Sequence, residues 1–91
     1  MEKIIMERQG SSKKDAKLIA QNLKNIDSCL LPLLNKWLET GEANNNVLYY
    51  GYSLNSLMDK YEMYFTGALL TLDWIIKDPA TACKALAEGI Q

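Results

Sequence analysis

The residues of this chain that could do chemistry are few, and their spacing matches no known catalytic arrangement. The sequence contains no histidine, which removes the usual general base, the Ser-His-Asp and Cys-His arrangements and most zinc sites. Its two cysteines, Cys29 and Cys83, do not lie in a CxxC motif, and the glycines form no phosphate-binding loop. We interpret the cysteines as two reduced core thiols rather than a disulfide or a metal pair.

The acidic residues are the remaining candidates for catalysis or metal binding. Asp59 and Glu62 would lie one turn apart on the exposed side of a helix, and Asp73 stands between two apolar residues. Glu62 also lacks the histidine three residues later that di-iron helical bundles use. We interpret these acids as solvated or helix-capping residues. The sequence therefore predicts a protein that is not an enzyme and that holds no cofactor and no metal.

A tyrosine cluster is the first candidate for a functional surface. The chain's five tyrosines all fall between residues 49 and 64. Tyrosine is frequent at protein interfaces because it offers a large, stiff contact area with a polar tip. The alternative is that Tyr61 is core, Tyr49 or Tyr52 covers the end of a helix bundle, and the others are ordinary surface residues. The candidate partner-contact residues are Tyr49, Tyr50, Tyr52 and Tyr64.

A group of lysines near the N-terminus is the second candidate surface. Residues 1–24 hold six basic and three acidic residues, whereas the rest of the chain holds four basic and eight acidic residues. A nucleic-acid footprint usually needs a stronger basic excess than this. We interpret the lysines first as a solvated helix face, and a nucleic-acid-associated regulator is the alternative hypothesis. The residues that it would use are Lys13, Lys14, Lys17 and Lys24.

Composition limits the class of protein. The 91 residues are 48% apolar and 23% charged, which excludes a disordered chain and fits a single helical domain over residues 1–91. No apolar run reaches the roughly 18 to 20 residues that span a bilayer. The first ten residues do not resemble a secretory signal. The sequence therefore predicts a cytoplasmic protein without a membrane segment.

The elements that must position these residues begin with a long helix over residues 12–40. Ser12 is its predicted N-cap. Pro32 lies in its interior, where a proline costs about 3 kcal/mol. The unbroken apolar spacing favours one helix kinked at Pro32, and the alternative is two helices that meet near Asp27 and Ser28. The apolar residues that recur at spacings of three and four are Ala16, Ile19, Leu23, Ile26, Leu30, Leu33 and Trp37.

A second long helix is predicted over residues 53–77, with Ser53 as its N-cap. Glycine in a helix interior costs roughly 1 kcal/mol relative to alanine, so Gly67 predicts the close approach of another helix. Met63, Leu70 and Trp74 form a further apolar stripe with Gly67, and Trp74, like Trp37, is expected in the core. The main stripe comprises Leu54, Met58, Tyr61, Phe65, Ala68, Leu72 and Ile75.

The remaining segments are shorter. Residues 1–10 could form a helical turn, a strand or a flexible arm. Residues 41–52, with three consecutive asparagines, are expected to form an irregular connecting loop. Asp78 and Pro79 predict the start of a short C-terminal helix. That helix is expected to bury Ala82, Cys83 and Leu86, with Ile90 as a further candidate.

The fold class that follows is all-α: an antiparallel hairpin of two long helices, kinked or broken near Pro32, with a short C-terminal helix. One short helix cannot cover both long apolar stripes, so we expect a homodimer that completes a four-helix core. The alternative is a monomeric four-helix bundle formed by a break at Pro32. We predict a small accessory or regulatory protein that acts by binding another protein, whose identity the sequence does not give.

Overall fold

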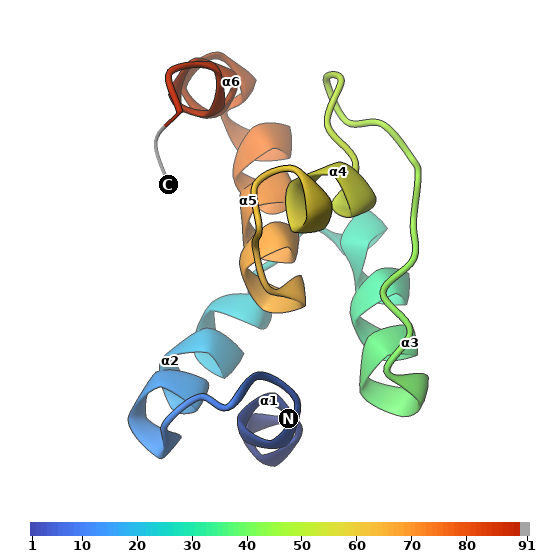
Figure 1. Cartoon of the computed structure of the whole chain (residues 1–91), viewed down its shortest axis with the longest axis vertical. Coiled ribbons are helices and arrows are strands. Elements are labelled where there is room, and N and C mark those ends of the chain that lie inside the picture. The colour runs from blue at the N-terminus through green and yellow to red at the C-terminus, as the bar shows by residue number, and fades with distance from the viewer. Residues whose placement is uncertain (90–91) are drawn as a thin grey trace.

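A computed structural model describes residues 1–89 of the chain. Within these residues the chain forms six α-helices, one short 3-10 helix and no strand, which confirms the all-α prediction (Figure 1). The helices pack around one buried apolar cluster. Both predicted long helices are divided, and residues 2–9, whose structure the sequence left open, form a helix. The elements are α1 (Glu2–Gln9), α2 (Lys13–Leu23), η1 (Ser28–Leu30), α3 (Leu31–Thr40), α4 (Leu54–Asp59), α5 (Phe65–Lys77) and α6 (Pro79–Ala87).

The first predicted long helix ends before Pro32 and not at it. Helix α2 begins at the predicted cap Ser12, whose Oγ accepts a hydrogen bond from a backbone N–H at 3.2 Å, and it ends at Leu23. Asp27 then takes an extended conformation and accepts a hydrogen bond from Cys29 N at 3.0 Å, which starts η1. Pro32 lies in the first turn of α3, where its missing N–H removes no hydrogen bond. The kinked single helix is therefore wrong, and the alternative of two helices is confirmed.

The second predicted long helix is also wrong, because the chain leaves helical geometry between α4 and α5. Ser53 is the N-cap of α4, as predicted, but α4 ends at Asp59. Glu62 has a φ of 55°, in the left-handed region that ends a right-handed helix. Because of this break, the apolar residues of α4 and α5 do not form one continuous stripe along a single helix. Leu57 and Phe65 are both buried within one chain.

Helix α1 joins the ends of two other helices. Its Arg8 guanidinium donates to the backbone oxygens of Trp37 and Leu38 at the end of α3, and lies 5.1 Å from the centre of the Trp37 ring. A cation at a helix C-terminus is favourable because the last carbonyl oxygens carry the negative end of the helix dipole. Gln9 accepts a hydrogen bond from Thr66 N, at the start of α5, at 3.2 Å. Residues 2–9 therefore link the end of α3 to the start of α5 through side-chain hydrogen bonds.

The core fills the space between α5 and the other helices. Trp37 is buried, as predicted, and its ring stacks on Phe65 with 4.5 Å between the ring centres. The expectation for Trp74 is wrong, because this residue is 40% exposed. A Cβ placed on Gly67 would meet no atom within 4 Å, so none of the helices among residues 1–89 approaches it, and an approach by another chain stays a prediction. Ile90 lies outside the described residues. The fully buried large side chains include Leu23, Leu30, Leu54, Leu57, Leu69, Leu72 and Ile75.

The cysteines differ from expectation in their burial. Both are free thiols, but Cys29 is exposed and Cys83 is partly buried. The expectation of a core position is wrong for Cys29 because the chain leaves α2 before it, which moves this residue off the predicted helix face. Partial desolvation of the exposed Cys29 thiol, with Asp27 beside it, raises the pKa of Cys29. A raised pKa keeps the thiol protonated and weakly nucleophilic near neutral pH.

Candidate functional site

The segment between α3 and α4 ends in a tight hairpin that displays apolar side chains. Tyr49 N donates to Tyr52 O at 2.7 Å, and Tyr52 N donates to Tyr49 O at 3.0 Å. Tyr50 and Gly51, at the turn, have φ values of 52° and 87°, as in the mirror-image turns that suit two-residue hairpins. A bulky residue rarely adopts this conformation, so the Tyr50 backbone is strained.

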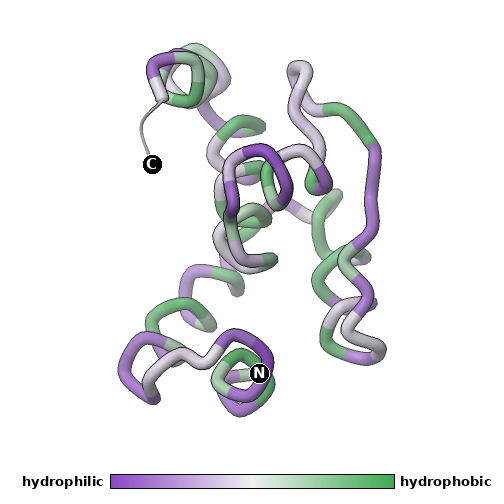
Figure 2. Tube along the Cα trace, in the orientation of Figure 1, coloured by the Kyte–Doolittle hydropathy of each residue, from purple (hydrophilic) through white to green (hydrophobic). Residues whose placement is uncertain are grey.

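We define the hairpin surface as Val47, Leu48 and Tyr50. Their side chains are 53%, 68% and 65% exposed. Figure 2 shows the chain changing from hydrophilic to hydrophobic along this segment, on the outside of the molecule. No charged residue occurs between Glu42 and Asp59. A neutral, apolar segment therefore faces solvent here.

Asn55, in the first turn of α4, holds the chain that leads to the hairpin surface. Its Nδ2 donates to the side-chain oxygens of Asn44 and Asn46, both at 2.7 Å. Its Oδ1 accepts from Asn45 N at 2.9 Å, and its own N–H donates to Asn45 O at 3.1 Å. The asparagine triplet that predicted an irregular loop is thus bound at all three positions by one residue.

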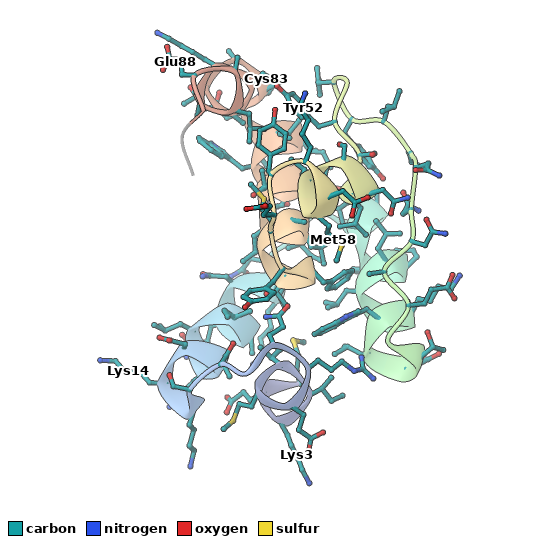
Figure 3. All side chains as sticks on the ribbon, viewed as in Figure 1. Lys3, Lys14, Tyr52, Met58, Cys83 and Glu88 are labelled. Carbon is teal, nitrogen blue, oxygen red and sulfur yellow. The ribbon has the colours of Figure 1, made fainter. Side chains whose placement is uncertain are left out.

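The four candidate tyrosines take different positions. Tyr49 and Tyr52 are half-buried against the core, and the Tyr52 ring (labelled in Figure 3) has its centre 6.2 Å from that of the Tyr61 ring. Tyr50 is exposed at the hairpin, and Tyr64 is exposed at the N-cap of α5. The structure therefore brings Tyr49, Tyr50 and Tyr52 together in one turn and places Tyr64 on another element.

Sequence reasoning missed Val47 and Leu48 as surface residues. Their composition is typical of a strand, and a strand would have buried one of them. The available signal was the position of these apolar residues directly after three asparagines and before a tyrosine-glycine turn. Asn55 had no local signal, because its partners lie nine to eleven residues away.

Burial raises the pKa of the Tyr49 and Tyr52 hydroxyls, with nearby Cys29 adding to the effect at Tyr49 and Tyr61 at Tyr52. A raised pKa in the folded state means that the neutral phenol stabilises the fold. That stability is fully present below the unfolded pKa of about 10 and is lost as the pH rises through the higher folded value. We expect the melting temperature to fall above about pH 10, and the double variant Tyr49→Phe, Tyr52→Phe to reduce that fall. Identical pH profiles of the melting temperature for both proteins would contradict this expectation.

The four candidate lysines belong to a different element, α2 and its C-cap. Lys13, Lys14 and Lys17 are on α2, Lys24 is its C-cap, and all four are exposed. None of them forms an ion pair within residues 1–89. Figure 3 shows Lys14, like Lys3 of the neighbouring α1, directed away from the molecule.

The acids considered for chemistry have structural or solvated positions. The Asp73 carboxylate accepts hydrogen bonds from Asp27 N at 2.8 Å and from Lys77 Nζ at 2.9 Å. Lys77 Nζ also donates to Asn25 O at 2.7 Å, so the pair Asp73 and Lys77 fixes the chain between α2 and η1. Asp59 and Glu62 are exposed.

Other features that often mark a function are not observed in the described part of the chain. Residues 1–89 contain no pocket and no group of three or more side chains that could hold a metal ion. None of the helices among these residues combines the length and the apolar character that crossing a bilayer requires. Comparison of the chain with protein families, with curated proteins and with solved structures finds no match.

Proposed function

We propose that this chain is a small accessory or regulatory protein that acts by binding another protein, not by catalysis, and that the hairpin surface makes the contact. The observation that carries the proposal is the exposure of Val47, Leu48 and Tyr50 on a segment that hydrogen bonds hold in place. Contiguous exposed apolar side chains often mark interaction sites. A surface that is already ordered loses less conformational entropy when it binds, so more of the contact energy appears as affinity.

The chemistry of the hairpin surface indicates the kind of partner. It offers two aliphatic side chains and one tyrosine, with no charge in the whole segment from residue 43 to residue 58. Interface cores are depleted in charged residues and enriched in aromatic ones. The expected partner site is a shallow apolar groove with a polar group that can meet the Tyr50 hydroxyl.

Affinity capture from cells that naturally produce the chain tests this proposal. The variant combines Leu48→Ser and Tyr50→Ser, and the matched control is Leu18→Ser, because Leu18 is 52% exposed on α2. We expect the wild type and the control to enrich the same protein and the double variant to lose it. Far-ultraviolet circular dichroism should show equal helix content in all three. Equal enrichment by the double variant would contradict the proposal.

Two further parts of the proposal concern the assembly and the location of the chain. Self-association was expected because long apolar stripes would stay uncovered, but Leu54, Leu72 and Ile75 are buried within one chain. That reason no longer applies, and self-association stays a prediction that sedimentation over a concentration series tests. A cytoplasmic location is proposed from the free thiols alone.

Nucleic-acid binding through Lys13, Lys14, Lys17 and Lys24 is the second candidate function. It is supported by the exposure of all four lysines without ion pairs among the described residues. Binding to mixed-sequence duplex that weakens steeply with added salt would favour it over protein binding. No detectable binding at low salt would remove it.

A further inference from the structure

The segment that leads to the hairpin has the backbone pattern of an edge strand, although no strand lies beside it within residues 1–89. Residues 41–48 contain no helix, turn or bend, and Figure 1 shows them running along the outside of the molecule. In an extended chain the N–H and C=O groups of one residue point to the same edge, and those of the next residue point to the opposite edge. The hydrogen bonds of this segment follow that alternation.

Alternate residues of the segment are bonded to the protein itself. Asn45 N donates to Asn55 Oδ1 at 2.9 Å, and Asn45 O accepts from Asn55 N at 3.1 Å. Tyr49 exchanges both of its backbone hydrogen bonds with Tyr52. Between them, Val47 N donates to Asn45 Oδ1 at 3.0 Å. One edge of the segment is therefore held by the chain's own groups.

The two residues in between leave their backbone groups free. Neither the N–H nor the C=O of Asn46 or of Leu48 takes part in a hydrogen bond within residues 1–89, and both residues are exposed. In the free chain, water satisfies these groups. Asn46 and Leu48 thus offer two donors and two acceptors along one outward edge.

The outward edge carries no residue that would prevent pairing. Soluble proteins usually protect an exposed edge with lysine, proline, a bulge or a covering segment. No charged residue and no proline occurs in residues 43–58. Val47 and Tyr49 also belong to the residue types that are enriched in strands. This edge is therefore open to another strand.

We infer that the partner pairs an uncovered edge strand of its own sheet with the backbone of Asn46 and Leu48. The inference rests on the proposed function and names the class of partner. A helix cannot occupy this edge by pairing, because its own N–H and C=O groups are bonded within the helix. A second copy of this chain offers only the same short edge, and a two-stranded ribbon is marginally stable in water. A sheet of three or more strands is the favoured partner.

The hairpin surface and the free edge act together in this arrangement. In strand addition, main-chain hydrogen bonds supply affinity, and pockets for alternate side chains supply specificity. The Leu48 side chain, which is 68% exposed, enters the apolar groove beside the paired edge. Asn55 already holds Asn45 and the Asn46 side chain in place, so little order has to be acquired on binding.

Methylation of the Leu48 backbone nitrogen tests the inference, because it removes one donor and keeps the leucine side chain. The full chain is assembled from two synthetic segments joined at Cys29. The matched control is N-methylation of Ser12, an exposed residue with extended backbone angles whose N–H makes no hydrogen bond within residues 1–89. The probe is the protein that the wild type enriches in the capture experiment. Calorimetry should give a dissociation constant at least tenfold larger for methylated Leu48 and an unchanged one for the control.

Hydrogen exchange of the unmodified chain gives a second readout. The amides of Asn46 and Leu48 should exchange at least tenfold more slowly in the complex than in the free chain, because a partner carbonyl accepts from each of them. The Ser12 amide should exchange at the same rate in both. Unprotected amides at residues 46 and 48 in the complex would contradict strand pairing.

The remaining outcomes separate this inference from the proposed function. If methylated Leu48 binds as the wild type does while the double variant Leu48→Ser, Tyr50→Ser does not bind, strand pairing is overturned and the hairpin surface remains the binding site. Equal affinities for all variants, or no enriched protein, overturn both. A dimer of the free chain that methylation of Leu48 abolishes assigns the edge to a second copy and overturns the partner proposed here.

Discussion

Replacement of Trp37 by alanine is expected to lower the free energy of unfolding by about 3 to 5 kcal/mol, the usual cost of removing a large aromatic ring from a core. Trp37 stacks on Phe65 and lies beneath the Arg8 guanidinium, so its loss also weakens the connection between α1 and α3. Chemical denaturation followed by circular dichroism measures the change.

Trp74→Ala is the matched control for that measurement, since it removes the same ring from a position that is 40% exposed. We expect this change to cost less than about 1 kcal/mol, as surface substitutions usually do. Equal losses for the two tryptophans would contradict the position of Trp37 in the core.

Replacement of Asn55 by alanine is expected to lower the free energy of unfolding by about 2 to 3 kcal/mol, because three side-chain hydrogen bonds are each worth about 1 kcal/mol. The larger effect is local: Asn44, Asn45 and Asn46 lose their shared partner. Hydrogen exchange should then accelerate in residues 41–52 before it changes in α5. Binding by the hairpin surface should weaken, since the segment must be ordered at the moment of binding.

Asn22→Ala is the control for this substitution, because Asn22 is an exposed asparagine of α2 whose side chain makes no hydrogen bond within residues 1–89. It should leave the exchange of residues 41–52 unchanged and raise the stability by no more than about 0.7 kcal/mol, the helix propensity of alanine over asparagine. If Asn55→Ala also leaves that exchange unchanged, Asn55 does not order the hairpin.

The helix caps were predictable from the sequence, whereas the breaks between helices were not. Ser12, Ser53 and Asp78 each accept a hydrogen bond from the backbone of the helix that follows, as their positions predicted. Apolar spacing could not reveal the breaks, because residues on both sides of each break face the same core and so keep the same periodicity. The turn at Glu62 occurs without the glycine that normally marks a left-handed residue.

The sequence predicted which segment carries the candidate site, but not which of its residues are exposed. The tyrosine cluster pointed to the segment around Tyr50, which the structure shows exposed. Which tyrosines are exposed depends on the turn between Tyr49 and Tyr52 and on the hydrogen bonds of Asn55 to residues nine to eleven positions earlier, which the local sequence pattern does not show. Gly67 predicted the close approach of another helix, but the sequence could not show that none of the helices among residues 1–89 approaches it.

The most direct test of the central claim is the affinity of the captured protein for the wild type, for the double variant Leu48→Ser, Tyr50→Ser, and for Leu18→Ser. Isothermal titration calorimetry should give a dissociation constant at least tenfold larger for the double variant, a loss of about 1.4 kcal/mol or more, and an unchanged value for Leu18→Ser. Three equal dissociation constants, in proteins of equal helix content, would show that the hairpin surface is not the binding site.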